Sequence, residues 1–366
     1  MTDGQADMEF LETLLASDRL SDPAKAGLGG LLVGLAFGAC AQASRFCLRS
    51  ASLEFWRGVF GPSFAVWLLV FGAALLCVQV LLWTEALPAM EVRQLTSVGT
   101  LSGAIIGGAM FGTGMILARG CASRLLVLSA TGNLRALMTG LLVTVVAQAA
   151  LSGILSPLRL ELSALWTVSP EIRNINLHVP DAFGIVLGGA LLAAAMVLAS
   201  RSALGLSRAL LSVALGATIA CGWLYTASLA HVSFEPVSVL SVTFTGPSAD
   251  TLMALITESS IPLGFSLGLV PGVALGAFAS SLIRREFHVE VFDQSTGMVR
   301  YVVGAVLMGF GGMLAGGCAV GAGVTGGSVL SLTAWLALLA MWLGAGACQW
   351  AMRDRGFAPA PGRILS

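Results

Sequence analysis

The 366-residue chain has few charged residues, and its 19 basic and 19 acidic side chains cancel to a formal net charge of zero. Charged residues make up only 10% of the chain. An ordinary soluble protein carries about 25%, so there are too few here to cover the surface of a soluble fold. A balanced charge also leaves no basic surface for phosphate groups, so no nucleic-acid partner is expected. With 57% hydrophobic residues, the composition indicates a polytopic membrane protein surrounded by lipid.

Motifs for metal, nucleotide or disulfide chemistry are also lacking. The seven cysteines include no Cys-x-x-Cys pair and no Cys/His cluster at metal-ligand spacing, which argues against a disulfide framework and a zinc site. No Gly-x-x-x-x-Gly-Lys-Ser/Thr loop is present to hold a nucleotide phosphate. We therefore expect no cofactor, no metal and no ATP hydrolysis.

Apolar stretches long enough to cross about 30 Å of hydrocarbon recur along the chain. They predict an all-α polytopic membrane protein with nine spanning helices, near residues 27–44, 62–87, 99–118, 136–156, 181–199, 207–229, 261–283, 299–317 and 328–352. The stretches 99–121 and 299–323 are crowded with glycine, so we expect these two helices to break inside the membrane. The predicted membrane domain is flanked by an acidic tail (residues 1–26), either an interfacial helix or a frayed end, and by a C-terminal tail (353–366).

The distribution of basic residues predicts the orientation. Connections on the side of the N-terminus contain five Lys and Arg residues, and those on the other side contain fourteen. Because cytoplasmic loops are enriched in basic residues, we expect the N-terminus outside and the C-terminus in the cytoplasm. Residues 157–180 and 230–260 then form outside connections.

Two glycine-rich segments repeat each other at an offset of 197 residues. Residues 112–122 and 309–319 are identical at seven of eleven positions, and both end in Gly-Cys-Ala. The predicted spans place them in helices of opposite direction, as in an inverted repeat whose broken helices build a substrate site. A weaker echo relates Gly30, Gly34 and Gly38 to Gly264, Gly268 and Gly272. Close helix packing is the alternative explanation for any one of these motifs.

Three cysteines differ in context from the other four. Cys121 and Cys318 close the repeated motifs, and Cys47 follows the first span. The other four lie within apolar runs and are expected to pack in the core as small hydrophobes: Cys40, Cys77, Cys221 and Cys348.

The surroundings of these three cysteines resemble a known family. The first span ends in a Gln…Arg-Phe-Cys pattern, at Gln42, Arg45, Phe46 and Cys47. Residues 117–122 read Leu-Ala-Arg-Gly-Cys-Ala, and residues 315–321 read Ala-Gly-Gly-Cys-x-x-Gly. These segments resemble the signatures of YeeE/YedE-type sulfur-compound transporters, whose better-understood members take up thiosulfate. Arg119 departs from the family pattern, which has glycine there.

The resemblance implies nine spanning helices with short membrane-dipping helices, and a pathway through the bacterial inner membrane for thiosulfate or a related sulfur anion. It implies a transporter rather than an enzyme, and a cytoplasmic sulfur-carrier protein as a possible partner beside the membrane lipid. The candidate substrate-binding residues are Cys47, Cys121, Cys318, Arg45, Gln42, Gly120, Gly317, Gly321 and Arg119.

A sulfur dianion is expensive to desolvate, so such a pathway must supply donors. Broken-helix amides offer partial positive charge, and Arg45, Arg119 and Arg124 offer full charge. Neutral thiols suit a soft sulfur terminus, and three weak sites in series would admit and release the ion. Arg119 would either tune the affinity or extend to the cytoplasmic surface. Gln42 would either donate its amide to the anion or pack between helices.

Three other functions remain open. A membrane-embedded sulfurtransferase or thiol redox enzyme would use the same cysteines covalently. However, the three histidines, His178, His231 and His288, all fall in predicted connections. A scaffold subunit is disfavoured because no connection is long enough for a sizeable soluble domain. A transporter of another sulfur or selenium species would have the same general pattern.

Overall fold

The computed structural model describes residues 21–233, 237–257, 263–290 and 297–353. Within these ranges, nine helical segments are long and apolar enough to cross a membrane, which confirms the predicted number of spans. The protein is an all-α integral membrane protein, with one two-stranded sheet in the described ranges.

Three of the nine spans are interrupted and six are continuous. The interrupted spans are α2 (Asp22–Ser44) with α3 (Leu48–Trp56), α6 (Leu101–Leu117) with α7 (Ala122–Ala130), and α15 (Met298–Leu314) with η2 (Ala319–Thr325) and α16 (Gly326–Ser328). The continuous spans are α4 (Pro62–Trp83), α8 (Leu134–Leu151), α11 (Phe183–Arg201), α12 (Leu206–Val232), α14 (Phe265–Ile283) and α17 (Leu332–Arg353). The breaks expected within 99–121 and 299–323 are therefore confirmed.

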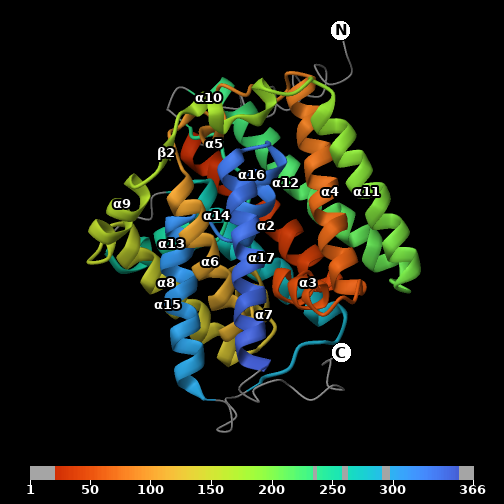
Figure 1. The fold of residues 1–366 in the computed structure, drawn as a ribbon, viewed down its shortest axis with the longest axis vertical. Coiled ribbons are helices and arrows are strands. Elements are labelled where there is room, and N and C mark those ends of the chain that lie inside the picture. Colours follow the sequence, from red (N-terminus) through yellow and green to blue (C-terminus); the bar gives the residue numbers. More distant parts are fainter. Residues whose placement is uncertain (1–20, 234–236, 258–262, 291–296, 354–366) are drawn as a thin grey trace.

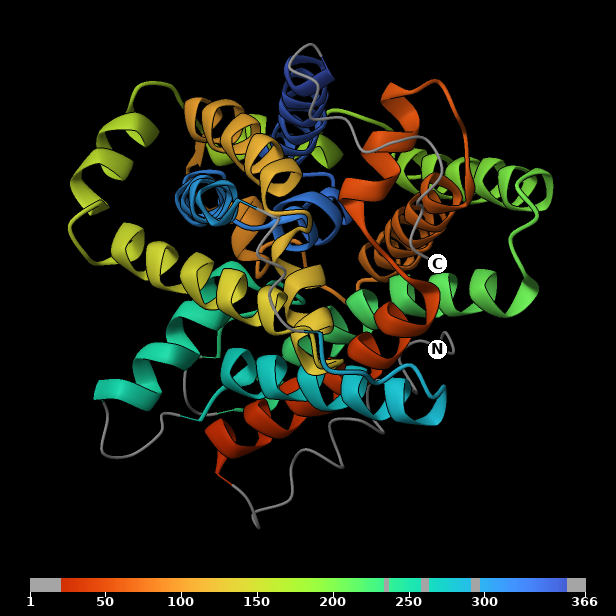
Figure 2. The same ribbon diagram turned by 90° about the horizontal axis from the view of Figure 1, so that it is seen from below.

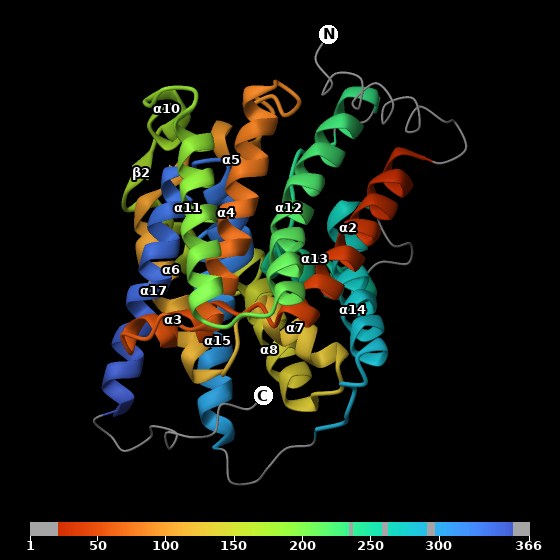
Figure 3. The same ribbon diagram turned by 90° about the vertical axis from the view of Figure 1, so that its right-hand side faces the viewer.

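Shorter elements connect the spans. They are α5 (Arg93–Thr96), α9 (Ser156–Ala164), α10 (Pro170–Arg173), η1 (Ile175–Leu177) and α13 (Thr245–Thr257), with strands β1 (Gly99–Thr100) and β2 (Thr167–Val168) paired antiparallel. The first span begins at the upper end of the molecule and α17 ends at the lower end (Figures 1 and 3). An odd number of crossings produces this arrangement.

The contacts between helices repeat with inverted symmetry. An offset of about 197 residues relates α2–α3 to α12–α13, α4 to α14, α6–α7 to α15–η2, and α8 to α17. Accordingly, α2 packs on α14 as α12 packs on α4, and α6 packs on α17 as α15 packs on α8. The central pair α6 and α15 cross each other, and α11 covers α4 without a counterpart (Figure 2). The predicted inverted repeat is thus a property of the whole bundle.

The weaker match between the glycines of the first and seventh spans reflects close helix packing and not the inverted repeat. α2 and α14 lie against each other in the same direction, and their glycines form the interface. A Cβ atom on Gly34 would lie 3.0 Å from Val273 N, and one on Gly272 would lie 3.0 Å from Leu31 Cα. In the inverted repeat, the element equivalent to α2 is α12 and not α14. The glycines of α2 and α14 therefore contact each other and are not equivalent positions of the two repeats.

The expectation that residues 230–260 lie outside as a connection is wrong. Residues 237–244 run into the bundle, where Val242 and Phe244 are buried, and α13 then packs against α8 and α14. Hydroxyl groups satisfy the extended backbone there: Thr226 Oγ1 donates to Leu240 O at 2.7 Å, and Thr325 Oγ1 donates to Val242 O at 2.6 Å. Irregular backbone is tolerated at membrane depth where protein surrounds it.

The first helix also begins earlier than expected. α2 starts at Asp22, with Lys25 Nζ 3.2 Å from the Asp22 carboxylate in its first turn. The rest of the predicted N-terminal tail, residues 1–20, and the C-terminal residues 354–366 lie outside the described residues, so these parts of the domain division stay a prediction.

Candidate functional site

Three helices end inside the bundle in the same way. The left-handed residues are Arg45 (φ 58°) after α2, Arg119 (φ 59°) after α6 and Gly316 (φ 82°) after α15. In each case the next amide donates back to a carbonyl five residues earlier: Phe46 to Ala41, Gly120 to Met115 and Gly317 to Gly312, at 3.2, 3.1 and 2.8 Å. This is the usual way in which a helix ends with a left-handed residue. It explains why glycine suits the position of Arg119.

One residue further on, each break places a cysteine at the start of the next helix. Cys47 is the N-cap of α3, Cys121 of α7 and Cys318 of η2. The free amides of a helix start lie next to each sulfur, and they carry partial positive charge. The sequence pattern predicted this recurrence, and the structure gives it one common geometry.

The three thiols face the protein interior. Cys47 is 7% exposed, and Cys121 and Cys318 are each 1% exposed, so none of them faces lipid. The other four cysteines are less buried: Cys40, Cys77 and Cys348 are partly buried, and Cys221 is exposed. The expectation of core packing is therefore wrong for Cys221, which lies on the outer surface of α12.

Cys47 and Cys121 form a pair. Their thiols lie near enough for each to act on the other. Cys121 Sγ also lies 3.3 Å from Ser123 Oγ. The helices that these cysteines begin, α3 and α7, lie in the lower half of the molecule (Figure 1).

Cys318 belongs to a separate upper position. Its sulfur accepts a hydrogen bond from the amide of Gly321 at 3.4 Å, and α16, which continues η2, lies in the upper half of the molecule (Figure 1). Thr243 closes this position, because a Cβ atom on Gly321 would lie only 2.6 Å from Thr243 Cβ. Among the described residues, no hydrogen bond joins Cys318 to the lower pair, but η2 and α7 touch each other. Sequence reasoning missed Thr243 because its segment was expected outside.

Gln42 and Arg45 point toward a carboxylate and not toward the thiols. Gln42 Nε2 donates to Glu286 Oε2 at 3.1 Å, and Arg45 Nη2 approaches Glu286 Oε1 at 3.5 Å. Glu286 follows α14, so this cluster fastens the end of α2 to the end of α14.

The remaining predicted positions have steric or surface roles. Gly317 has φ 156°, and a Cβ atom there would lie 2.8 Å from Ala322 N, so glycine is required. Gly120 is buried, and a Cβ atom on it would meet Leu125 Cδ2 at 3.2 Å. The Arg119 side chain is exposed. This agrees with the alternative in which Arg119 extends to the surface and does not tune the affinity for the anion.

Two arginines that follow cysteines lie beside the lower pair. Arg124 was expected as a full charge in the pathway, whereas Arg49 was not among the predicted site residues. Arg49 and Arg124 both act electrostatically on Cys47. Arg49 Nε and Arg124 Nη1 are buried without a hydrogen-bond partner. Their spacing was the available signal, because each lies two or three residues after a cysteine, in the first turn of a broken helix.

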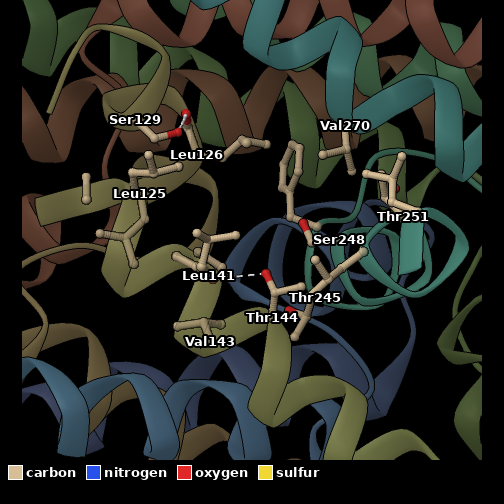
Figure 4. A pocket seen from close by; sticks show the side chains of 17 residues that line it. Leu125, Leu126, Ser129, Leu141, Val143, Thr144, Thr245, Ser248, Thr251 and Val270 are labelled. Atoms are coloured by element: carbon tan, nitrogen blue, oxygen red, sulfur yellow. Dashed lines mark hydrogen bonds between the residues drawn. The ribbon is translucent and has the colours of Figure 1, made fainter. Parts of the chain in front are cut away.

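A cavity of about 190 Å³ opens between α7, α8, α13 and α14 (Figure 4). Leucines and valines dominate its wall, with a few hydroxyls such as Thr144, Thr245 and Ser248. No described lining residue is a cation or a thiol, so the wall offers little to compensate the charge of a dianion. The symmetry-related region between α3, α4, η2 and α17 is filled by aromatic rings, such as Trp67 and Trp342 with centroids 5.2 Å apart.

The described part of the chain contains no group of three or more His, Cys, Asp or Glu residues that could hold a metal ion. All three histidines are exposed at the ends of the bundle, as predicted. The chemistry of the buried breaks is therefore confined to thiols, hydroxyls, amides and guanidinium groups.

Comparison with known proteins gives two kinds of match. The sequence profile of a family described as Sulphur transport matches residues 43–347. The chain is 29% identical over 346 residues to the thiosulfate transporter TsuA of Spirochaeta thermophila, covering 89% of this chain and 99% of that protein. It is 25% identical over 354 residues to the thiosulfate transporter TsuA of Escherichia coli strain K12, covering 88% and 94%.

Proposed function

Because the chain belongs to the sulphur-transport family, we propose that it carries thiosulfate, or a closely related sulfur anion, across the membrane past Cys318, Cys121 and Cys47. The observation that carries this proposal is the shared geometry of the three breaks. Each buried cysteine begins a helix directly after a left-handed turn, inside the bundle. The names of the two relatives support thiosulfate as the anion.

The breaks supply what a dianion loses when it leaves water. A desolvated anion needs donors, and helix starts offer oriented amides and partial positive charge without adding a mobile counterion. Donors beside the thiols are the Gly321 amide at the upper position, and the Ser123 hydroxyl with the amides of Ser50 and Arg124 at the lower pair. Arg49 and Arg124 add full charge at the lower pair.

Thiols suit one end of thiosulfate. Its terminal sulfur is large and polarizable, and a neutral S–H is a weak donor that attracts it without holding it tightly. An upper position at Cys318 and a lower position at Cys47 and Cys121 form two steps in series. Weak sites in series allow an ion both to bind and to leave, which conduction requires.

We propose that the direction is import across the bacterial inner membrane. The positive-inside distribution of basic residues supports an orientation with the arginine-rich lower end in the cytoplasm and the N-terminus outside. Under this orientation the anion meets Cys318 first and the Cys47–Cys121 pair second. Gln42 and Arg45 act as positioning residues, since their contacts with Glu286 fix the turn that precedes Cys47.

Transport accounts for the cysteines better than covalent catalysis does. No histidine or carboxylate of the described residues interacts with the Cys47 or Cys121 thiol, so neither has a general base beside it. At the cytoplasmic end, exposed arginines such as Arg57 and Arg285 offer a surface to an acidic sulfur-carrier protein. We propose such a carrier as the receiving partner.

The test is uptake of radiolabelled thiosulfate by liposomes containing the purified protein. Cys47→Ala, Cys121→Ala and Cys318→Ala should each reduce uptake at least tenfold. Cys221→Ala is the matched control, because Cys221 lies on the exposed face of α12, and it should behave as the wild type. Wild-type uptake in all three single variants would refute the proposed path. A cysteine persulfide trapped during turnover, with sulfite released from thiosulfate, would favour the enzyme alternative.

A further inference from the structure

Four arginines gather at the lower end of the molecule, next to the Cys47–Cys121 pair. They come from different elements: Arg49 from α3, Arg119 from the turn after α6, Arg124 from α7 and Arg300 from α15. Arg119 and Arg300 lie close enough to Arg49 for their like charges to act on it. Arg49 and Arg124 in turn act on Cys47. These four residues are called the arginine basin below.

Within the described ranges, no carboxylate pairs with an arginine of the basin. Among the described residues, the carboxylates of the connections and helices at this end are engaged elsewhere: Glu54 accepts from the amides of Ser63 and Phe64, Glu286 pairs with Arg45 and Arg284, and Glu290 pairs with His288. No basin arginine has an ion pair with a described residue. Four like charges gathered in this way are unfavourable unless an anion joins them.

Several donors in the basin are buried and have no acceptor. Arg49 Nε, Arg124 Nη1 and Arg300 Nε each lack a hydrogen-bond partner, and so does the hydroxyl of Tyr301. Tyr301 is only 5% exposed, and its phenol group lies close enough to Arg49 and Arg300 to act on both electrostatically. Buried donors are almost always paired in proteins, so this set is ready to bind an acceptor.

We propose that the arginine basin binds a tetrahedral oxyanion at the inner end of the pathway. The inference rests on the proposed function: the oxygens of thiosulfate would reach the guanidinium groups while its terminal sulfur leaves the Cys47–Cys121 pair. Guanidinium forks match the spacing of oxyanion oxygens and form charge-assisted hydrogen bonds. The unpartnered donors of Arg49, Arg124 and Arg300 are buried, so a small anion can reach them and the surface of a docking protein cannot.

A lipid phosphate has the same tetrahedral oxyanion chemistry as thiosulfate. The basin adjoins the thiols through Arg49 and Arg124, so we assign it to the transported anion. Competition with lipid separates the two sources. Nanodiscs containing phosphatidylglycerol should leave anion binding the same as nanodiscs of phosphatidylcholine alone.

The experiment is equilibrium binding of inorganic sulfate and of thiosulfate to the purified full chain. Arg49→Gln should weaken the binding of both anions about tenfold, as expected for losing a charge-assisted hydrogen bond. Tyr301→Phe removes only the unpartnered hydroxyl, preserves the ring, and should weaken binding about threefold. Arg201→Gln is the control, since it removes an exposed charge at the same end and should change nothing.

Each outcome decides one point. Unchanged binding in both Arg49→Gln and Tyr301→Phe would overturn the inference, and so would equal weakening in Arg201→Gln. If phosphatidylglycerol competes strongly with sulfate and thiosulfate, the basin binds a lipid phosphate and not the transported anion. Because binding is measured without transport, a wild-type protein that binds sulfate here but takes up no thiosulfate would refute the proposed function alone.

Discussion

Gly321→Ala perturbs the upper position by a single methyl group. A Cβ atom at this residue would lie 2.6 Å from Thr243 Cβ, and it would come still closer to the Thr243 hydroxyl. Ordinary contacts begin at 3.4 Å, so the neighbours must separate by about 0.8 Å or more. Overpacking of this kind costs about 1–3 kcal/mol.

The displacement of Gly321 has a direct consequence for Cys318. The Gly321 amide donates to the Cys318 sulfur at 3.4 Å, so a shift of residue 321 disturbs this hydrogen bond and the position of the thiol. We expect uptake of labelled thiosulfate by liposomes to fall at least tenfold, with the protein still folded, as judged by its elution in size-exclusion chromatography.

The control and the rescue are both available in the same region. Gly246→Ala adds the same methyl group at the start of α13, where no atom lies within 4 Å, and uptake should be unchanged. Thr243→Gly removes both offending atoms and leaves Thr243 Cα at 3.3 Å, so the double variant should recover much of the lost uptake. Equal uptake by Gly321→Ala and Gly246→Ala would refute the reasoning.

Three further predictions concern the lower half. Mild oxidation should join Cys47 to Cys121 and block uptake until reductant is added, because their thiols lie near each other; mass spectrometry that finds no such disulfide would contradict the pairing. Arg119→Gly should raise stability by up to about 1 kcal/mol, since a left-handed residue with a side chain costs about 1–2 kcal/mol and the greater freedom of glycine offsets part of the gain. A lower unfolding temperature would argue against it. Glu286 O and the Glu290 carboxylate raise the pKa of His288 above its ordinary value of 6.5, so the small stabilisation by His288 is present below pH 6.5 and is lost as pH rises through the raised pKa. The difference in melting temperature between wild type and His288→Ala should therefore vanish at alkaline pH, and a difference that grows there would reverse the sign.

Much of the fold was predictable because hydrocarbon thickness imposes a length on apolar segments. Glycine-rich motifs also located two of the breaks correctly. The connection 230–260 was misjudged because a stretch without Lys or Arg, rich in Ser and Thr, looks the same whether it lies in water or inside a protein. Only the surrounding helices decide, and in the bundle Thr226 and Thr325 satisfy its backbone.

The candidate site was predictable in kind but not in detail. Repetition of Gly-Cys-Ala pointed to Cys121 and Cys318, and the third cysteine came with the family resemblance. Which two thiols pair could not follow from spacing, because the pairing depends on how α3 and α7 cross. Arg49 was counted only as a positive-inside charge, and its lack of a partner is visible only in three dimensions. Conversely, Gln42 and Arg45 carried a good motif but contact Glu286.

The central claim is that a sulfur anion passes the starts of the three broken helices. The most direct measurement is an experimental map of the protein with bound thiosulfate at high concentration. The account predicts anion density beside Cys318 or beside the Cys47–Cys121 pair, within reach of the helix-start amides. Density confined to the apolar cavity between α7, α8, α13 and α14, with none at any of the three cysteines, would contradict it.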